Sequence, residues 1–215
     1  MPNREKSLQK YKTLAATYDR FYQFEEGRQV AVRRIGLSSG EAVLDAGCGT
    51  GLNFGFFEEA IGPDGAIVAI DQCPEMIERA RARIARHGWQ NITLITSPVE
   101  EAVIPFLADV AFFFTTHDLL RTPRAVENVL RHIKPGGRVL AAGVKLAGLA
   151  HPILSLWAIR RARDTATTLE GLSHPWSNLE SYVPDLDVEE LGGWYVASGV
   201  VPGAAADRAG GSSAR

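Results

Sequence analysis

The sequence has few cysteines, no long hydrophobic run and no excess of charge of one sign. Its two cysteines, Cys48 and Cys73, are too few for a disulfide framework, and no Cys/His spacing typical of a zinc or other metal site is present. No stretch of about eighteen apolar residues occurs, which excludes a membrane-spanning helix. The formal net charge of −2 argues against a nucleic-acid-binding protein that relies on positive charge.

The first ten residues also lack the apolar segment of a secretory signal, so the sequence predicts a cytoplasmic protein. A length of 215 residues, 46% of them hydrophobic, is enough for one domain with added elements. We expect a single domain over residues 1–201, in which segments 1–36 and 145–183 cover the core. Residues 202–215 are rich in Gly, Ala and Ser and predict a disordered tail.

Short apolar runs alternate with helical patterns along the chain, as in a parallel sheet with helices on both faces. The predicted strands are 42–46, 66–70, 92–95, 110–114 and 138–142, and the predicted helices between them are 53–61, 74–87 and 121–133. Residues 134–137 (Lys-Pro-Gly-Gly) predict the turn before the fifth strand. Two further strands, 186–191 and 194–198, are joined by two glycines and predict an antiparallel hairpin. The expected fold is therefore α/β, with a seven-stranded, mostly parallel sheet.

A glycine-rich loop follows the first predicted strand. It reads D-x-G-x-G-x-G from Asp45, with Gly47, Gly49 and Gly51 at alternate positions. Glycine suits a sharp turn that brings the backbone close to a ligand. The dinucleotide fingerprint G-x-G-x-x-G requires glycine where this chain has Leu52. An acid before the first glycine opposes a pyrophosphate but suits a ligand with an ammonium group, which favours S-adenosylmethionine over NAD; the alternative is a structural strand-to-helix turn.

Asp71 ends the second predicted strand. There a carboxylate is placed to accept hydrogen bonds from both hydroxyls of a ribose. The alternative is that Asp71 caps the helix that starts at Pro74.

In this order, the glycine loop and Asp71 resemble the class I S-adenosylmethionine-dependent methyltransferases, over about residues 11–198. Within that class the chain is similar to small-molecule enzymes, namely the quinone-biosynthesis and phospholipid N-methyltransferases. The resemblance implies a Rossmann-like sheet and S-adenosylmethionine as cofactor. The residues that we assign to the cofactor site from this resemblance are Tyr11, Asp45, Gly47, Cys48, Gly49, Gly51, Asn53, Asp71, Gln72, Met76, Pro98, Val99 and Thr115.

The third motif departs from the family. Many members carry Gly-Asp-Ala after the third strand, and their acid contacts the adenine amino group. Here residues 96–100 read Thr-Ser-Pro-Val-Glu, with Pro98 at the place of the acid. The adenine contact is then left to the backbone N–H of Val99 or to the side chain of Ser97 or Glu100.

His117 and Tyr18 are the candidate catalytic residues. His117 follows the fourth strand, where open α/β sheets place their sites, and imidazole titrates near neutral pH. The alternative is that His117 caps the following helix or fills a loop. Asp118 beside it is a candidate to orient the imidazole or to cap a helix. Residues 8–22 predict one amphipathic helix with Tyr11 and Tyr18 on one face. This aromatic face belongs either to the hydrophobic core or to the functional site. The pair Tyr18-Asp19 resembles the helix that covers the cofactor in quinone-biosynthesis methyltransferases, and in phosphoethanolamine methyltransferases such a tyrosine works with a histidine after strand four.

The resemblance implies methyl transfer to N, O or C of a small, hydrophobic acceptor, and no nucleic acid. Segment 145–163 is apolar and ends in Arg160, Arg161 and Arg163, which suits either a lid over a pocket or a contact with an anionic membrane surface. One alternative function is therefore phospholipid-headgroup N-methylation at a membrane. Another is a non-catalytic S-adenosylmethionine-binding protein. The sequence does not indicate an oligomeric state.

Overall fold

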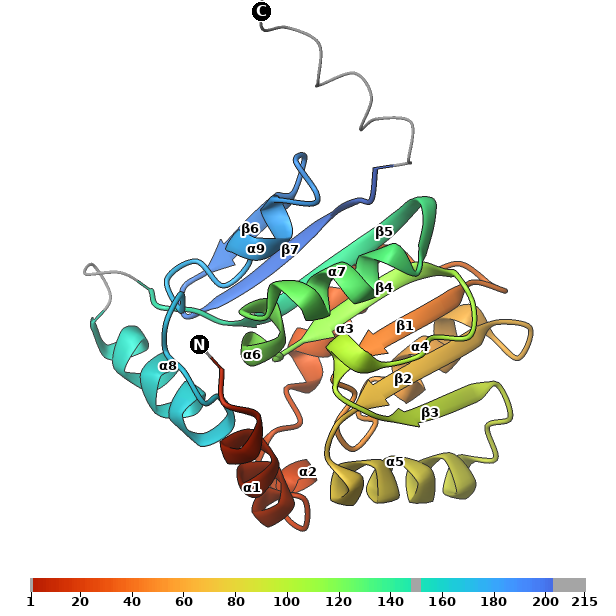
Figure 1. The fold of residues 1–215 in the computed structure, drawn as a ribbon, viewed down its shortest axis with the longest axis horizontal. Helices are drawn as coiled ribbons and strands as arrows, with labels where there is room; N and C mark the ends of the chain where they lie inside the picture. Colours follow the sequence, from red (N-terminus) through yellow and green to blue (C-terminus); the bar gives the residue numbers. More distant parts are fainter. Residues whose placement is uncertain (1, 148–151, 203–215) are drawn as a thin grey trace, which may run out of the picture.

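The computed structural model describes residues 2–147 and 152–202, and its centre is one seven-stranded sheet (Figure 1). The strands are β1 (Ala42–Ala46), β2 (Ala66–Asp71), β3 (Ile92–Thr96), β4 (Ala108–Phe114), β5 (Ile133–Val144), β6 (Asp187–Leu191) and β7 (Trp194–Val200). Their order is β3-β2-β1-β4-β5-β7-β6. The pairs among β1 to β5 are parallel, whereas β7 pairs antiparallel with β5 and β6. The predicted fold class, including the hairpin, is confirmed.

Helices cover both faces of this sheet. They are α1 (Arg4–Leu14), α2 (Tyr18–Phe21), α3 (Glu25–Ile35), α4 (Phe54–Ile61), α5 (Pro74–His87), the 3-10 turn η1 (Val99–Glu101), α6 (His117–Leu120), α7 (Pro123–Arg131), α8 (Pro152–Thr165) and α9 (Ser177–Glu180). Helices α3, α4 and α5 pack on one face, and α7 and α9 pack on the other. The α1, α2 and α8 helices lie beyond the ends of the strands (Figure 1).

The central strands are buried on both sides, which explains their uninterrupted apolar sequences. Val43 of β1 faces the α3–α5 layer and Leu44 faces the α7 layer, and both are fully buried. Likewise, Phe112 of β4 faces the α3–α5 layer and Phe113 faces the α7 layer. Strands without a solvent-exposed face carry no polar alternation, so the pattern predicted a parallel sheet correctly.

The single helix predicted over residues 8–22 is wrong. Helix α1 ends at Leu14, and the N–H of Thr17 donates to the carbonyl of Leu14 (2.9 Å), closing a tight turn before α2. The break lets Tyr18 stack on Tyr22, with ring centroids 4.8 Å apart, and both join the buried cluster that contains Met76 of α5. Tertiary packing of these aromatic rings outweighs the local periodicity.

The helix predicted over 121–133 is shorter, because Pro123 disfavours helical geometry at the residue before it. Residues 134–137 do not form a separate turn but lie within β5, where the register against β4 shifts between Ala108 and Val110.

Apart from residue 202, the expected tail lies outside the described residues. None of the helices in the described part of the chain is both long and apolar enough to cross a membrane.

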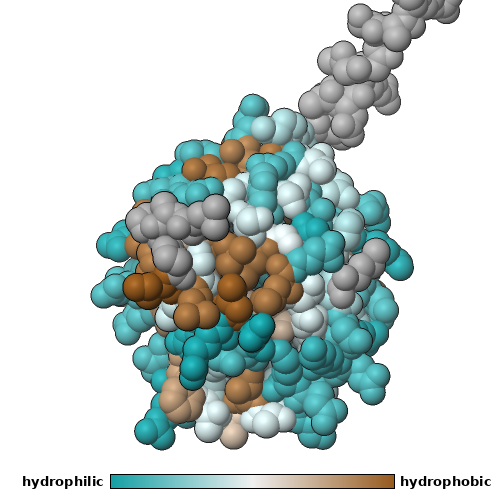
Figure 2. Space-filling view, turned by 90° about the vertical axis from the view of Figure 1, so that its left-hand side faces the viewer, coloured by the Kyte–Doolittle hydropathy of each residue, from teal (hydrophilic) through white to brown (hydrophobic). Residues whose placement is uncertain are grey.

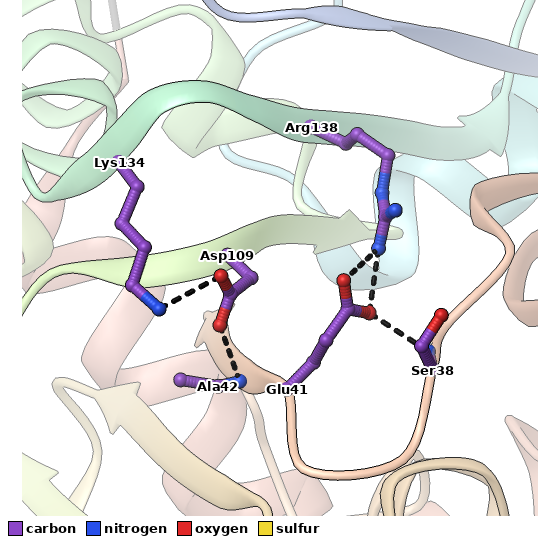
Figure 3. A network of polar contacts seen from close by, with 6 residues as sticks. All are labelled: Ser38, Glu41, Ala42, Asp109, Lys134 and Arg138. Carbon is purple, nitrogen blue, oxygen red and sulfur yellow. Dashed lines mark hydrogen bonds and ion pairs between the residues drawn. The ribbon is translucent and has the colours of Figure 1, made fainter.

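A polar network joins the amino ends of β1, β4 and β5, opposite the carboxyl ends of these strands (Figure 3). The Asp109 carboxylate accepts from the N–H of Ala42 (2.9 Å) and from Lys134 Nζ (2.8 Å). Arg138 Nη2 donates to both oxygens of Glu41 at 2.7 and 2.6 Å. Burial alone would raise the pKa of Asp109, but the N–H of Ala42 and the ammonium of Lys134 outweigh it, and the pKa is lowered.

We expect Asp109→Ala to lower the free energy of unfolding by about 1–3 kcal/mol, because the partly buried N–H of Ala42 loses its acceptor. Since the folded-state pKa of Asp109 is lowered, its contribution is present above the ordinary carboxyl pKa and is lost as the pH falls through the folded value. Urea denaturation at several pH values measures both effects. Glu101→Ala, which removes only an exposed ion pair with Arg4, is the control; an equal loss there would contradict the assignment.

Candidate functional site

The carboxyl ends of the parallel strands open on a cavity with an empty volume of about 1000 Å³, including its mouth. Its walls come from the loops after β1, β2 and β4, from η1, from the ends of β5 and β7, and from the covering helices α1, α2 and α8. Segments distant in sequence therefore meet at the position where open α/β sheets bind ligands.

The glycine loop after β1 forms one wall. Gly47, Gly49 and Gly51 have φ of 80°, 57° and 76°, a region that residues with a side chain rarely adopt. A Cβ on Gly47 would lie 2.6 Å from Thr116 Cγ2, and one on Gly51 would lie 2.4 Å from the Phe54 ring. A Cβ on Gly49 would meet nothing within 4 Å. Gly47 and Gly51 are thus required by packing, whereas Gly49 keeps its face of the cavity open.

Asp71 joins this loop to the end of β2. Its carboxylate accepts from the N–H of Gly49 (2.9 Å) and from the N–H of Cys73 (2.8 Å) and lies on the cavity wall. Burial raises the pKa of Asp71 to about 6, although these two N–H groups oppose the rise. The residue that caps α5 is Cys73, so the alternative that Asp71 is the helix cap is wrong.

Asp45 lies behind the loop rather than on the cavity wall. It is fully buried, and both of its oxygens accept from Asn53 Nδ2 at 3.1 Å. Asn53 Oδ1 accepts from Arg28, whose guanidinium lies 4.4 Å from the centre of the Phe114 ring. Burial raises the pKa of Asp45 to about 7, while Asn53 and Arg28 oppose the rise. This chain of contacts anchors α3 to the glycine loop.

The structure brings about half of the predicted cofactor residues together. Those on the cavity wall are Tyr11, Gly47, Gly49, Asp71, Gln72, Val99 and Thr115. Those outside it are Asp45, Cys48, Gly51, Asn53, Met76 and Pro98. Met76 is fully buried under the aromatic rings of α1 and α2, and Pro98 is buried before η1. Of the three residues expected to contact adenine, Val99 and Glu100 line the cavity and Ser97 does not.

Tyr11 and Tyr18 cover the cavity from α1 and α2, with ring centroids 6.2 Å apart. Burial raises the pKa of both phenols, so both stay neutral at physiological pH. Asp19 fixes α2 in place, because its carboxylate accepts from Arg83 (2.5 Å) and from the hydroxyl of Thr50 in the glycine loop. Lys10 Nζ donates to two carbonyls at the end of α8 and so joins the two sides of the cover.

His117 lies on the cavity wall with one ring nitrogen unpaired. Its Nε2 lies 3.1 Å from the carbonyl of Glu170 and, opposite an acceptor, must carry the proton. Its Nδ1 is buried and has no hydrogen-bond partner among the described residues. Burial lowers the pKa of His117, so the neutral ring presents a lone pair at Nδ1. Asp118 does not orient it; that carboxylate accepts from the N–H and hydroxyl of Thr167 at 2.9 and 2.8 Å.

The backbone just before His117 is strained. Thr115 has φ of 57°, although it is β-branched, and it lines the cavity. Such a conformation is uncommon outside glycine and concentrates at functional sites.

Tyr195 is a wall residue that the sequence did not predict. It is 2% exposed, pairs with Gly143 of β5, and its ring packs 4.9 Å from that of Trp176. Burial raises the pKa of its phenol. Strand alternation indicates that Tyr195 and Val196 face opposite sides. The side that meets the cavity follows only from the antiparallel pairing with β5.

Comparisons with known proteins agree on one class. A family model described as "Methyltransferase domain" matches residues 43–137. The demethylmenaquinone methyltransferase of Lactococcus lactis is 26% identical over 165 residues, which cover 72% of this chain and 63% of that protein.

Solved structures show the same fold. A methyltransferase from Aquifex aeolicus, described as SAM-dependent, has a TM-score of 0.62 at 22% identity and covers 90% of this chain and 97% of its own. The N-methyltransferase NodS of Bradyrhizobium japonicum, in complex with S-adenosylhomocysteine, has a TM-score of 0.65 at 17% identity and covers 92% of this chain and 99% of its own.

The chain spans less than two thirds of the length of the curated relatives that it matches. The share is 63% for the Lactococcus lactis protein and 28% and 46% for two others.

We expect Asp71→Ala to weaken the binding of S-adenosylhomocysteine by about 1–3 kcal/mol, because the ligand loses hydrogen bonds to a carboxylate. In the unmodified protein, affinity should rise as the pH increases through about 6, where Asp71 loses its proton. Asp71→Asn should abolish that dependence. Isothermal titration calorimetry at several pH values measures both, with Asp64→Ala in the loop before β2 as control. Unchanged affinity in Asp71→Ala would contradict the role.

The site fits the cofactor that the motif indicated. Gly49 leaves open space, Asp71 directs a carboxylate to the cavity, and the cavity continues past this pair toward His117. A carboxylate at the end of the second strand suits the ribose hydroxyls. The chain therefore contains a class I S-adenosylmethionine-dependent methyltransferase domain, and this domain resembles that of the quinone-biosynthesis enzymes.

Proposed function

We propose that this protein transfers the methyl group of S-adenosylmethionine to nitrogen, oxygen or carbon of a small, hydrophobic acceptor. The observation that carries the proposal is the apolar part of the cavity wall. Besides Gly49 and Asp71, the cavity is bordered by Leu119, Val144 and Leu172 and by small residues of α8. Apolar walls with a few polar groups favour a hydrophobic ligand held in one orientation.

The charges on the wall favour an acceptor without phosphate. Among the described residues that line the cavity there is no lysine or arginine, and Asp71, Glu100 and Asp118 are acidic. A phosphate moved out of water needs cationic partners or several N–H donors. This argues against a phospholipid headgroup as acceptor and for a neutral or cationic group, such as a phenol, an enol or an amine.

S-adenosylmethionine, when bound, would supply a methyl group that its sulfonium makes electrophilic. Two features of this chain would serve the transfer. The walls position the acceptor and exclude water, and positioning supplies much of the rate. In this proposal His117, which lines the cavity and whose Nδ1 has no partner among the described residues, takes the proton from the acceptor, and the neutral phenol of Tyr18 lines the same cavity.

The function is tested with S-adenosylmethionine that carries a labelled methyl group. Matched acceptors are compared: an apolar phenol and an apolar amine, each with and without a phosphate ester elsewhere in the molecule. We expect transfer only to the forms without phosphate. Transfer confined to the phosphorylated forms would favour a headgroup-like substrate, and cofactor binding without transfer to any acceptor would favour a non-catalytic role.

We expect His117→Ala to lower kcat about 10²–10⁴-fold with an oxygen or nitrogen acceptor while leaving S-adenosylhomocysteine affinity within a factor of about two. Since burial lowers the pKa of His117, kcat should fall on the acid side only below the ordinary histidine value of 6.5. His87→Ala, at the exposed end of α5, is the matched control. A similar kcat in both variants would remove His117 as the base.

A further inference from the structure

Helix α8 presents large apolar side chains to solvent. Ile153 is 82% exposed, Leu156 is 69% exposed, and Leu154 and Trp157 are each about 40% exposed. Figure 2 shows hydrophobic residues gathered on the side of the molecule where α8 lies. Contiguous exposed apolar side chains of this size are uncommon on a monomer and mark a contact surface.

The inner side of α8 carries small residues instead. Ala158, Ala162 and Ala166 recur every four residues and are at most 7% exposed, and Ala162, Thr165 and Ala166 line the cavity. The helix thus turns its alanines to the protein and its large apolar residues outward, the reverse of an ordinary surface helix.

The turn between β6 and β7 extends the outer surface. Leu191 at this turn is 49% exposed. A Cβ on Gly192 would lie 3.2 Å from Leu154 Cδ1, and one on Gly193 would lie 3.6 Å from the Trp157 ring, so the turn packs against α8. We call Ile153, Leu154, Leu156, Trp157 and Leu191 the α8 patch.

Positive charge borders the α8 patch. Arg160 and Arg163 are exposed on the next turns of α8, and neither forms an ion pair within the described part of the chain. Arg161 instead turns inward over the rings of Tyr22 and Phe24, at 5.0 and 5.3 Å.

Acidic groups lie nearby but are partly neutralised. On β6, Glu189 pairs with Arg34 and Glu190 pairs with Lys145. Asp164 follows Arg163, and Glu25 and Glu26 border the groove that Leu191 shares with Trp194.

We propose that the α8 patch inserts into the headgroup region of a lipid bilayer that contains anionic lipid, with Arg160 and Arg163 against its phosphates. A helix with Trp, Leu and Ile on one side and arginines at its edge suits this interface. The role of this docking rests on the proposed function. Helix α8 also lines the cavity, and an apolar acceptor partitions into the bilayer.

Flotation of the full chain with vesicles tests the inference. We expect binding to vesicles of phosphatidylcholine mixed with phosphatidylglycerol, weaker binding to phosphatidylcholine alone, and release at high salt. The double substitution Ile153→Glu/Leu156→Glu should abolish binding. Arg160→Gln/Arg163→Gln should lower the partition coefficient on anionic vesicles roughly thirtyfold. Val103→Glu, at a site 86% exposed in the loop before β4, is the matched control and should bind normally.

Absence of binding to anionic vesicles at low salt would overturn the inference, as would equal binding by the Ile153→Glu/Leu156→Glu variant. A dimer in sedimentation that this variant dissociates, without vesicle binding, would assign the patch to a second copy and also overturn it. S-adenosylhomocysteine affinity and transfer to a water-soluble acceptor are measured without vesicles. A failure of the proposed function is therefore distinguishable from a failure of membrane docking.

Discussion

The hydrogen bonds that Asp71 accepts from Gly49 and Cys73 hold the geometry on which the site depends. They join the loop after β1 to the end of the adjacent strand β2, where Ala46 pairs with Ile70. The loop keeps three glycines in the left-handed region, and its N–H at Gly49 is directed at the carboxylate. Because the surroundings raise the pKa of Asp71 to about 6, these two N–H groups are what keep it ionised near neutral pH.

The two halves of the cavity are built in different ways. The half at Gly49 and Asp71 is made by strand ends and backbone, which the buried sheet holds rigidly. The other half depends on α1, α2 and α8, which are held by side-chain contacts. Asp19 attaches α2 to Arg83 of α5, and Lys10 attaches α1 to the end of α8. In the proposed function the first half would hold the cofactor, and an inserted cover would let one fold serve different acceptors.

Features set by local pattern were predictable from the sequence, and features set by tertiary packing were not. The strand 42–46 and the helix 74–87 were predicted with the bounds that the structure shows, since burial on both faces and a proline start mark them locally. The break before Tyr18 and the place of Tyr195 on the wall depend on partners distant in sequence. For the same reason the resemblance to the family assigned Met76 and Asp45 to the cofactor site, whereas their side chains lie outside the cavity.

Two departures from local rules remain, and both border the same cavity. Thr115 is β-branched in a left-handed conformation, and α8 exposes Ile153 and Leu156 while burying alanines. Burying a side chain of that size contributes about 1.5–3 kcal/mol, so a helix rotated about its axis would gain stability on hydrophobic burial alone. The same rotation would turn the exposed side chains beside Ala162, those of Arg160 and Arg163, toward the cavity that Ala162 and Ala166 now border. It would fill that space and remove two charges from water, which offsets the gain and favours the observed orientation of α8.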